Sequence, residues 1–121
     1  MPASIDDVIA VYREVFKTHS PSEFVISGTS SGAVMTGEVA IKLRVLGLSE
    51  PAAFGIFSGF GDFTQSGDSL SCFTGRGLGG YLKPPHGIGE NRQAYAGATR
   101  QDDPVLSPMK SDLAGLPRPC S

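Results

Sequence analysis

Hydrophobic residues recur at helical spacing near the start of the chain, between Ile5 and Phe16. Six of them would form one apolar face of a helix: Ile5, Val8, Ile9, Tyr12, Val15 and Phe16. Ser4 stands where a capping residue is expected, and Asp6 and Asp7 follow in the first turn, where carboxylates favour the positive end of the helix dipole. The sequence predicts that this helix ends at His19-Ser20-Pro21, because a proline restricts the residue before it.

Two short apolar runs follow, with a helical pattern between them. The runs lie in Glu23 to Ser27 and in Ala52 to Phe57, and their apolar residues are adjacent rather than alternating. Such runs suit strands that are covered on both faces, as in parallel sheets. The pattern between them predicts a helix from Gly32 to Gly47. The order helix, strand, helix, strand indicates a βαβ crossover, and hence an α/β fold with parallel strands and helices on both faces.

The segment from Ser58 to Pro119 has a different character, because it is rich in glycine and proline. A stretch of this length without regular structure is unusual in a compact domain. We therefore expect short helices around Asp68 to Thr74 and near Met109 to Leu113.

Composition narrows the function classes. Ten basic and twelve acidic residues give a net charge of -2 without any block of like charges, which argues against a nucleic-acid partner. Cys72 and Cys120 are far apart and lack metal-ligand spacing, so we expect two reduced thiols. The apolar runs are too short for a membrane span, and the N-terminus lacks the basic region of a signal peptide. The expected protein is soluble and cytoplasmic.

The sequence Gly-Thr-Ser-Ser-Gly, from Gly28 to Gly32, stands between the first predicted strand and the second predicted helix. It fits G-x-S-x-G, the turn that presents a nucleophilic serine in hydrolases. Glycine is needed two positions before and after Ser30 because the two backbones approach closely there. The helix that follows would place backbone N–H groups and its dipole near a developing oxyanion.

Other readings of the glycine-rich turns stay open. The corner at Ser30 could be a tight turn without chemistry, or a cradle for a phosphate group. No G-K-[ST] sequence follows it, which disfavours the phosphate. A second cluster, Gly75 to Gly80, has the spacing G-x-G-x-x-G, but it lacks the preceding strand and following helix that a dinucleotide site requires.

Three stretches of the chain resemble the hormone-sensitive-lipase-like branch of the α/β-hydrolases. They are the Ser30 corner with its helix, which continues as KLRVLGLSEPAAFGIFSG, the start PASIDDVIAVYREV, and the later DDPVLSPMKSDLAGLPRP. Thr29 before the serine, and the stretch FSGFGDFTQSGDSL, resemble the subgroup with G-T-S-A-G at this corner. The resemblance spans nearly the whole chain and implies a three-layer α/β-hydrolase fold.

The resemblance implies a role for each residue of the corner. Ser30 would be the nucleophile, Gly28 and Gly32 the glycines of the turn, and the backbone N–H of Ser31 a donor in the oxyanion hole. Ser31 and Ala33 depart from the family, which usually has alanine and glycine at these positions. Both replacements are small, so we expect the turn to form. No cofactor and no metal ion is implied.

The resemblance also implies what these residues lack. The family's H-G-G-G motif lies upstream of the segment with which this chain begins, and the catalytic Asp and His lie beyond GLPRPCS. We therefore expect residues 1–121 to be a partial α/β-hydrolase domain, an internal fragment without the catalytic His and Asp. Neither His19, which closes the first helix, nor His86, in a Pro/Gly-rich loop, stands at the family's base position.

Three carboxylates could be mistaken for the catalytic acid and need a separate interpretation. Asp102 and Asp103 belong to the family's D-P-x-x-S-P turn, where we expect side-chain bonds to the backbone. Asp62, after the second strand, is expected to organise its loop.

The predicted activity is hydrolysis of a small carboxylic ester or lactone through an acyl-enzyme on Ser30. This chain alone is expected to be inactive, because the base is missing. The other hypotheses are a non-catalytic remnant or interaction module with the same fold, and a catalytic domain that a separate chain completes. In each case, strands that have lost their neighbours are expected to promote self-association through an exposed sheet edge.

Overall fold

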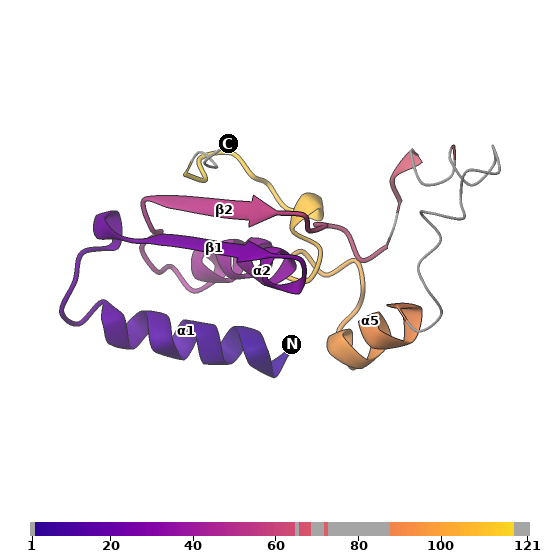
Figure 1. Cartoon of the computed structure of the whole chain (residues 1–121), viewed down its shortest axis with the longest axis horizontal. Coiled ribbons are helices and arrows are strands. Elements are labelled where there is room, and N and C mark those ends of the chain that lie inside the picture. Colours follow the sequence, from indigo (N-terminus) through magenta and orange to yellow (C-terminus); the bar gives the residue numbers. More distant parts are fainter. Residues whose placement is uncertain (1, 65, 69–71, 73–87, 118–121) are drawn as a thin grey trace.

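The computed structural model describes residues 2–64, 66–68, 72 and 88–117. Its elements follow one another along the chain as α1 (Ala3–Val15), the 3₁₀ turn η1 (Pro21–Glu23), β1 (Val25–Thr29), α2 (Ser31–Val45), β2 (Ala53–Phe57), α5 (Ile88–Ala96) and the 3₁₀ turn η2 (Pro108–Lys110). Figure 1 shows β1 and β2 side by side, with α2 behind them and α5 beyond the ends of the strands.

The two strands form a parallel pair in the register Val25 with Ala53 through Thr29 with Phe57. Helix α2 connects them, so the predicted βαβ crossover is confirmed. Strand β1 begins two residues later than predicted, because Pro21–Glu23 form a 3₁₀ turn in which the Ser20 N–H donates to Glu23 Oε2 at 2.9 Å.

Helix α1 forms where the apolar pattern placed it, but both predicted ends are wrong. The helix stops at Val15, before the predicted end at His19-Ser20-Pro21. Pro2 is the residue before the first helical position, and Ser4 lies inside the first turn. A proline with φ −60° already has the backbone angle that the start of a helix requires, so the chain enters the helix two residues earlier.

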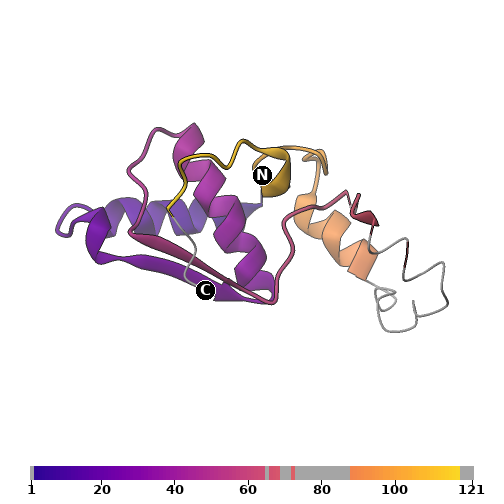
Figure 2. The same ribbon diagram turned by 90° about the horizontal axis from the view of Figure 1, so that it is seen from above.

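The main hydrophobic core lies between α1, α2 and the strands. Its buried members are Ile5, Ile9, Tyr12, Val39, Ala40, Leu43 and Phe54. Figures 1 and 2 show α1 and α2 on the same face of the strand pair. Exposure alternates along β1, and Val25 and Phe57 are 56% and 52% exposed. The prediction that Glu23 to Ser27 is covered on both faces is therefore wrong for the described residues, because α1 and α2 cover only one side.

The segment after β2 returns to α2 twice. Residues 59–64 pack on residues 101–109, where the Phe63 N–H donates to Ser107 Oγ and the Met109 N–H donates to the Gly61 carbonyl. Further on, Arg44 near the end of α2 donates to the carbonyls of Asp112 and Ala114 at 2.9 and 2.7 Å. These bonds fix the segment on the helix that follows Ser30.

Several sequence predictions concern this later segment. The helix predicted near Met109 to Leu113 is wrong beyond its first residues, because the 3₁₀ turn η2 ends at Lys110 and residues 111–113 are not helical. The helix predicted around Asp68 to Thr74 falls largely outside the described residues, as do Gly75 to Gly80, His86 and Cys120, whereas Cys72 is an exposed free thiol. Helix α5 was not predicted. Among the described residues, no helix combines the length and apolar character that crossing a bilayer requires.

Candidate active site

Ser30 lies at the corner between β1 and α2, as the sequence predicted. Its backbone angles are φ 57° and ψ −119°, in a region that residues with a Cβ rarely adopt. The Ser30 N–H donates to the Phe57 carbonyl at 3.0 Å, and the Ser30 carbonyl accepts from the N–H groups of Ala33 and Val34. Hydrogen bonds to β2 and to the first turn of α2 thus hold Ser30 in a backbone conformation that is unfavourable for serine.

Glycine at position 28 is a steric requirement of this corner. A Cβ on Gly28 would lie 2.2 Å from the carbonyl carbon and oxygen of Gly32, and 2.8 Å from the Ala33 nitrogen. A Cβ on Gly32 would meet no atom within 4 Å. The two glycines do approach each other, as predicted, but only Gly28 has no room for a side chain.

Ser31 is the first residue of α2. The first N–H groups of a helix have no carbonyl partner within the helix, and they carry the positive end of its dipole. This end of α2 directly follows Ser30, so an anion formed beside the Ser30 hydroxyl would meet N–H donors there.

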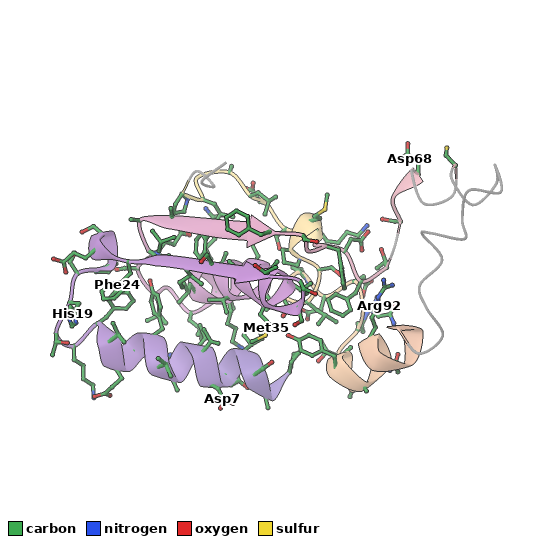
Figure 3. All side chains as sticks on the ribbon, in the orientation of Figure 1. Asp7, His19, Phe24, Met35, Asp68 and Arg92 are labelled. Carbon is green, nitrogen blue, oxygen red and sulfur yellow. The ribbon has the colours of Figure 1, made fainter. Side chains whose placement is uncertain are left out.

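A cavity of about 470 Å³, here called the Ser30 cavity, opens at this corner. It is lined by Ser30, Ser31, Val34, Met35, Ser58, Gly59, Phe60, Phe63, Arg92 and Tyr95. Two of these lining residues, Met35 of α2 and Arg92 of α5, are labelled in Figure 3. The cavity therefore joins the corner, the loop after β2 and α5.

Ser58 is the second strained residue of the site. Its φ is also 57°, and Ser30 and Ser58 are the two non-glycine residues with positive φ among those described. Ser58 directly follows β2, and its neighbour Gly59 lies so close to α2 that a Cβ there would be 2.6 Å from the Ala33 Cβ. A strained serine thus directly follows each strand, and both serines line the same cavity.

Aromatic rings form the wall opposite the corner. Phe63 stacks on Tyr95 with centroids 5.9 Å apart, and Phe60 meets the edge of Phe63 at 5.1 Å. The Arg92 guanidinium carbon lies 4.9 Å from the Phe60 ring centroid. The wall is apolar with one cationic group, which suits a small organic substrate.

A buried acid lies behind this wall. The Tyr95 hydroxyl donates to Glu38 Oε2 at 2.5 Å, and Glu38 is fully buried on α2. Burial raises the pKa of Glu38 to about 7, although the bond from Tyr95 acts the other way. Burial and the bond to Glu38 raise the pKa of Tyr95.

His19 lies far from the corner. Its ring packs against Phe24 with centroids 5.3 Å apart, just before β1, whereas Ser30 directly follows that strand. The six steps of extended chain from Phe24 to Ser30 span roughly 20 Å at about 3.3 Å per residue. Figure 3 shows His19 and Phe24 at the opposite end of the strands from Arg92.

Asp62 organises its loop, as predicted. Its carboxylate accepts bonds from the N–H and hydroxyl groups of Thr64 and Ser66, and Lys110 lies 3.5 Å away. Burial acts to raise its pKa, but the bonds from Ser66 and Thr64 outweigh this effect and hold the pKa well below its ordinary value.

The two other carboxylates differ from each other. Asp103 Oδ1 accepts from the Val105 N–H at 2.9 Å, which is the predicted side-chain bond to the backbone. Asp102 instead pairs with Arg100 at 2.7 Å on the surface, so the turn prediction does not describe its main contact. Asp103 already accepts the backbone N–H bond of this turn, so the Asp102 carboxylate can pair with Arg100.

The sequence did not identify the cavity wall. Ser58, Phe60, Phe63, Arg92 and Tyr95 stand in a segment without periodic pattern. One signal for α5 was available: Gly97 follows it with φ 56°, the usual conformation of a glycine that ends a helix. In the part of the chain that the structure describes, no three His, Cys, Asp or Glu side chains gather as metal ligands.

Comparison with known proteins assigns nearly the whole chain to one family. Residues 1–120 match a family model described as alpha/beta hydrolase fold. An acetyl-hydrolase of Streptomyces hygroscopicus is 29% identical over 117 residues, which are 96% of this chain and 38% of that protein. This chain thus spans about two fifths of the length of the curated relatives that it matches.

Solved structures show the same relationship. A hormone-sensitive lipase from a metagenome library is 36% identical with a TM-score of 0.80, over 97% of this chain and 39% of that one. The hormone-sensitive-lipase homologue EstE7, also from a metagenome library, is 35% identical with a TM-score of 0.78, over 96% of this chain and 39% of that one.

Proposed function

Since this chain belongs to the α/β-hydrolase family, we propose that it carries the nucleophile of a serine esterase and that Ser30 is this nucleophile. The observation that carries the proposal is the strained backbone of Ser30, between a strand and a helix N-terminus, at the edge of a cavity of about 470 Å³. The sequence relatives and structural neighbours, named as an acetyl-hydrolase and hormone-sensitive lipases, support an ester as the substrate.

The proposed reaction passes through an acyl-enzyme. A base removes the proton of the Ser30 hydroxyl as Oγ attacks the carbonyl carbon of a small ester or lactone. The N–H of Ser31, at the N-terminus of α2, donates to the resulting oxyanion. The alcohol leaves, water attacks the acyl-Ser30 ester, and the acid is released. The apolar rings of the cavity wall would hold the carbon chain of the substrate.

We propose that the base and its partner acid are not supplied by these 121 residues. The position of His19 at the opposite end of β1 supports this proposal. Asp62 and Asp103 are engaged in loop bonds, and Asp102 pairs with Arg100. In addition, the matched relatives are more than twice as long as this chain.

Hydrolysis of p-nitrophenyl acetate tests both parts of the proposal. The purified chain should hydrolyse the ester near the background rate, because triad members act as a unit. The longest product of the same reading frame should be active and should lose about a thousandfold or more in kcat with Ser30→Ala. Ser58→Ala, a matched serine of the same cavity, should retain most of the activity.

The possible outcomes separate the two claims. Ser30-dependent turnover by the 121-residue chain would keep the nucleophile but overturn the claim about the base. Activity that Ser30→Ala leaves unchanged would overturn the nucleophile.

An interaction module with the same fold is the second candidate. The exposed apolar residues Val25 and Phe57 on the open face of the strands favour it. A stable complex of defined stoichiometry, in size-exclusion chromatography with light scattering, together with no esterase activity in any product of the reading frame, would support this function instead.

A further inference from the structure

The least expected group in this molecule is the carboxyl of Glu38. Its side chain is 0% exposed, and no other Asp, Glu, Lys or Arg is buried among the side chains whose placement the structure describes. The bond from the Tyr95 hydroxyl satisfies Oε2 at 2.5 Å, whereas Oε1 is buried without a hydrogen-bond partner in the described part of the chain. Nothing in the proposed reaction uses Glu38, so its burial needs another explanation.

The bond from Tyr95 joins two elements on opposite sides of the Ser30 cavity. Glu38 belongs to α2, the helix that begins beside Ser30, and Tyr95 belongs to α5. Apart from this bond, α5 is joined to α2 by a small buried cluster of Val34, Phe63, Ala96 and Leu106. We propose that Glu38 is a positioning residue: its protonated carboxyl holds Tyr95, and with it the α5 wall of the Ser30 cavity, against α2, and releases this wall when it ionises.

Burial explains why the closed arrangement favours the neutral form, since the bond from Tyr95 by itself favours the carboxylate. A neutral carboxyl that accepts from Tyr95 at Oε2 carries its proton on Oε1 and leaves only that one donor unsatisfied. A carboxylate in the same place would carry a full charge with a single donor, which is a costly state in an apolar interior. Ionisation therefore favours any conformation in which α5 moves away and water reaches Glu38. The pKa of Glu38, raised to about 7 by burial against the opposing bond from Tyr95, is consistent with this coupling.

Charged groups nearby do not replace the missing partner. On α2, Lys42 lies one turn after Glu38, but its ammonium group faces Asp6 of α1 at 3.8 Å. On α5, Arg92 lies one turn before Tyr95, and its guanidinium group lies over Phe60. Tyr95 is itself a poor proton donor to solvent, since burial and the bond to Glu38 raise its pKa.

Hydrogen exchange of the purified chain, measured by mass spectrometry from pH 5 to pH 9 and corrected for intrinsic rates, tests this proposal. The open state has the ordinary Glu pKa of 4.5 and the closed state a pKa of about 7, so opening becomes more favourable as pH rises through this window. Exchange of the α5 peptides should increase roughly tenfold to a hundredfold. Exchange of the α1 peptides, on the far side of α2, should change much less.

Two variants identify the group that titrates. Glu38→Gln keeps a neutral group of the same shape, so α5 should stay protected up to pH 9. Tyr95→Phe removes the bond between the two helices, so the α5 peptides should already exchange faster at pH 5. Exchange in α5 that does not depend on pH would overturn the proposal, as would equal changes in α1 and α5, or a transition that persists in Glu38→Gln.

The inference rests on the proposed function in one respect, that the cavity which Tyr95 lines receives the substrate of Ser30. The exchange measurement needs no catalysis. A negative result would therefore remove the role of Glu38 and leave Ser30 as the proposed nucleophile. Conversely, esterase activity independent of Ser30 would leave the link between Glu38 and α5 intact.

Discussion

Two hollows of similar size flank helix α2, and they differ in chemistry. The Ser30 cavity measures about 470 Å³, and a second hollow, here called the apolar groove, measures about 430 Å³. The groove is lined by Ala33, Gly37, Ala40, Ile41, Phe54, Ile56, Gly59, Phe60, Gly61, Pro108, Met109, Leu113, Leu116 and Pro117. All of these side chains are apolar. The Ser30 cavity instead has four hydroxyl groups, of three serines and one tyrosine, and a guanidinium group.

Backbone strain separates the two hollows as clearly as polarity does. Both non-glycine residues with positive φ among those described, Ser30 and Ser58, line the Ser30 cavity, and neither lines the groove. Strain persists only where the surrounding structure enforces it, and it gathers at functional sites. Volume alone would not tell the hollows apart, whereas hydroxyl groups on strained backbone mark the one beside Ser30 as the candidate active site.

The largest effect is expected from Gly28→Ala, which attacks the corner itself. The new Cβ would lie 2.2 Å from backbone atoms of Gly32 that cannot move without breaking the start of α2. We expect a loss of roughly 3 kcal/mol or more in the free energy of unfolding, or failure to fold. Urea denaturation followed by circular dichroism measures it.

Gly32→Ala is the matched control for this change, because its Cβ meets nothing within 4 Å and alanine favours a helix. It should cost nothing, or stabilise by up to about 1 kcal/mol. Equal losses in the two variants would show that the close approach at Gly28 does not hold the corner together.

The next effect concerns the floor of the apolar groove. Ile41 is 4% exposed, so Ile41→Ala should lower the free energy of unfolding by about 2–4 kcal/mol through lost burial and a new cavity. Ile56, at the rim of the same groove, is 50% exposed, and Ile56→Ala should cost about 1 kcal/mol or less. Urea denaturation measures both losses. Equal losses in the free energy of unfolding would show that Ile41 is not packed more tightly than Ile56.

A smaller effect of opposite sign is expected from Ser30→Gly. Glycine adopts positive φ without a Cβ penalty, so relief of strain at φ 57° should stabilise the chain by about 1 kcal/mol. Ser31→Gly, one residue on and inside the helix, should instead destabilise by about 0.5–1 kcal/mol. Thermal unfolding of the two variants would give opposite shifts in Tm. A lower Tm for Ser30→Gly would show that the backbone of Ser30 is not strained.

The smallest effect on stability is expected on the open face of the strands. Val25 is 56% exposed, so Val25→Lys should change the free energy of unfolding by no more than about 0.5 kcal/mol. If exposed strands pair between copies of the chain, the lysine should shift the protein towards the monomer, because charge on an exposed strand opposes pairing. Size-exclusion chromatography measures this shift. A wild-type chain that is monomeric at all concentrations would contradict the predicted self-association.

Much of the fold could be predicted from short stretches of sequence. The apolar face of α1, the strand β2 and the order of strand, helix and strand all follow from the apolar pattern. The bounds of β1, α2 and β2 were placed within about two residues, whereas α1 ends about four residues before its predicted end. Helix α5 could not be found this way, because Tyr95 and Ala96 alone do not make a periodic apolar face. The open face of β1 was also missed, since an apolar run indicates burial without telling what buries it.

The sequence by itself determined the corner at Ser30, because its requirement is local: a glycine with no room for a Cβ stands two residues before a serine that opens a helix. Only the tertiary structure decided what faces that serine. Ser58, Arg92 and Tyr95 reach the cavity from distant parts of the chain, and no periodic pattern marks them. Glu38 would ordinarily be assigned to solvent as a charged residue on a helix, and its burial depends on a tyrosine 57 residues away. Steric rules act between neighbours in sequence, whereas burial, pKa and the shape of a cavity depend on long-range packing.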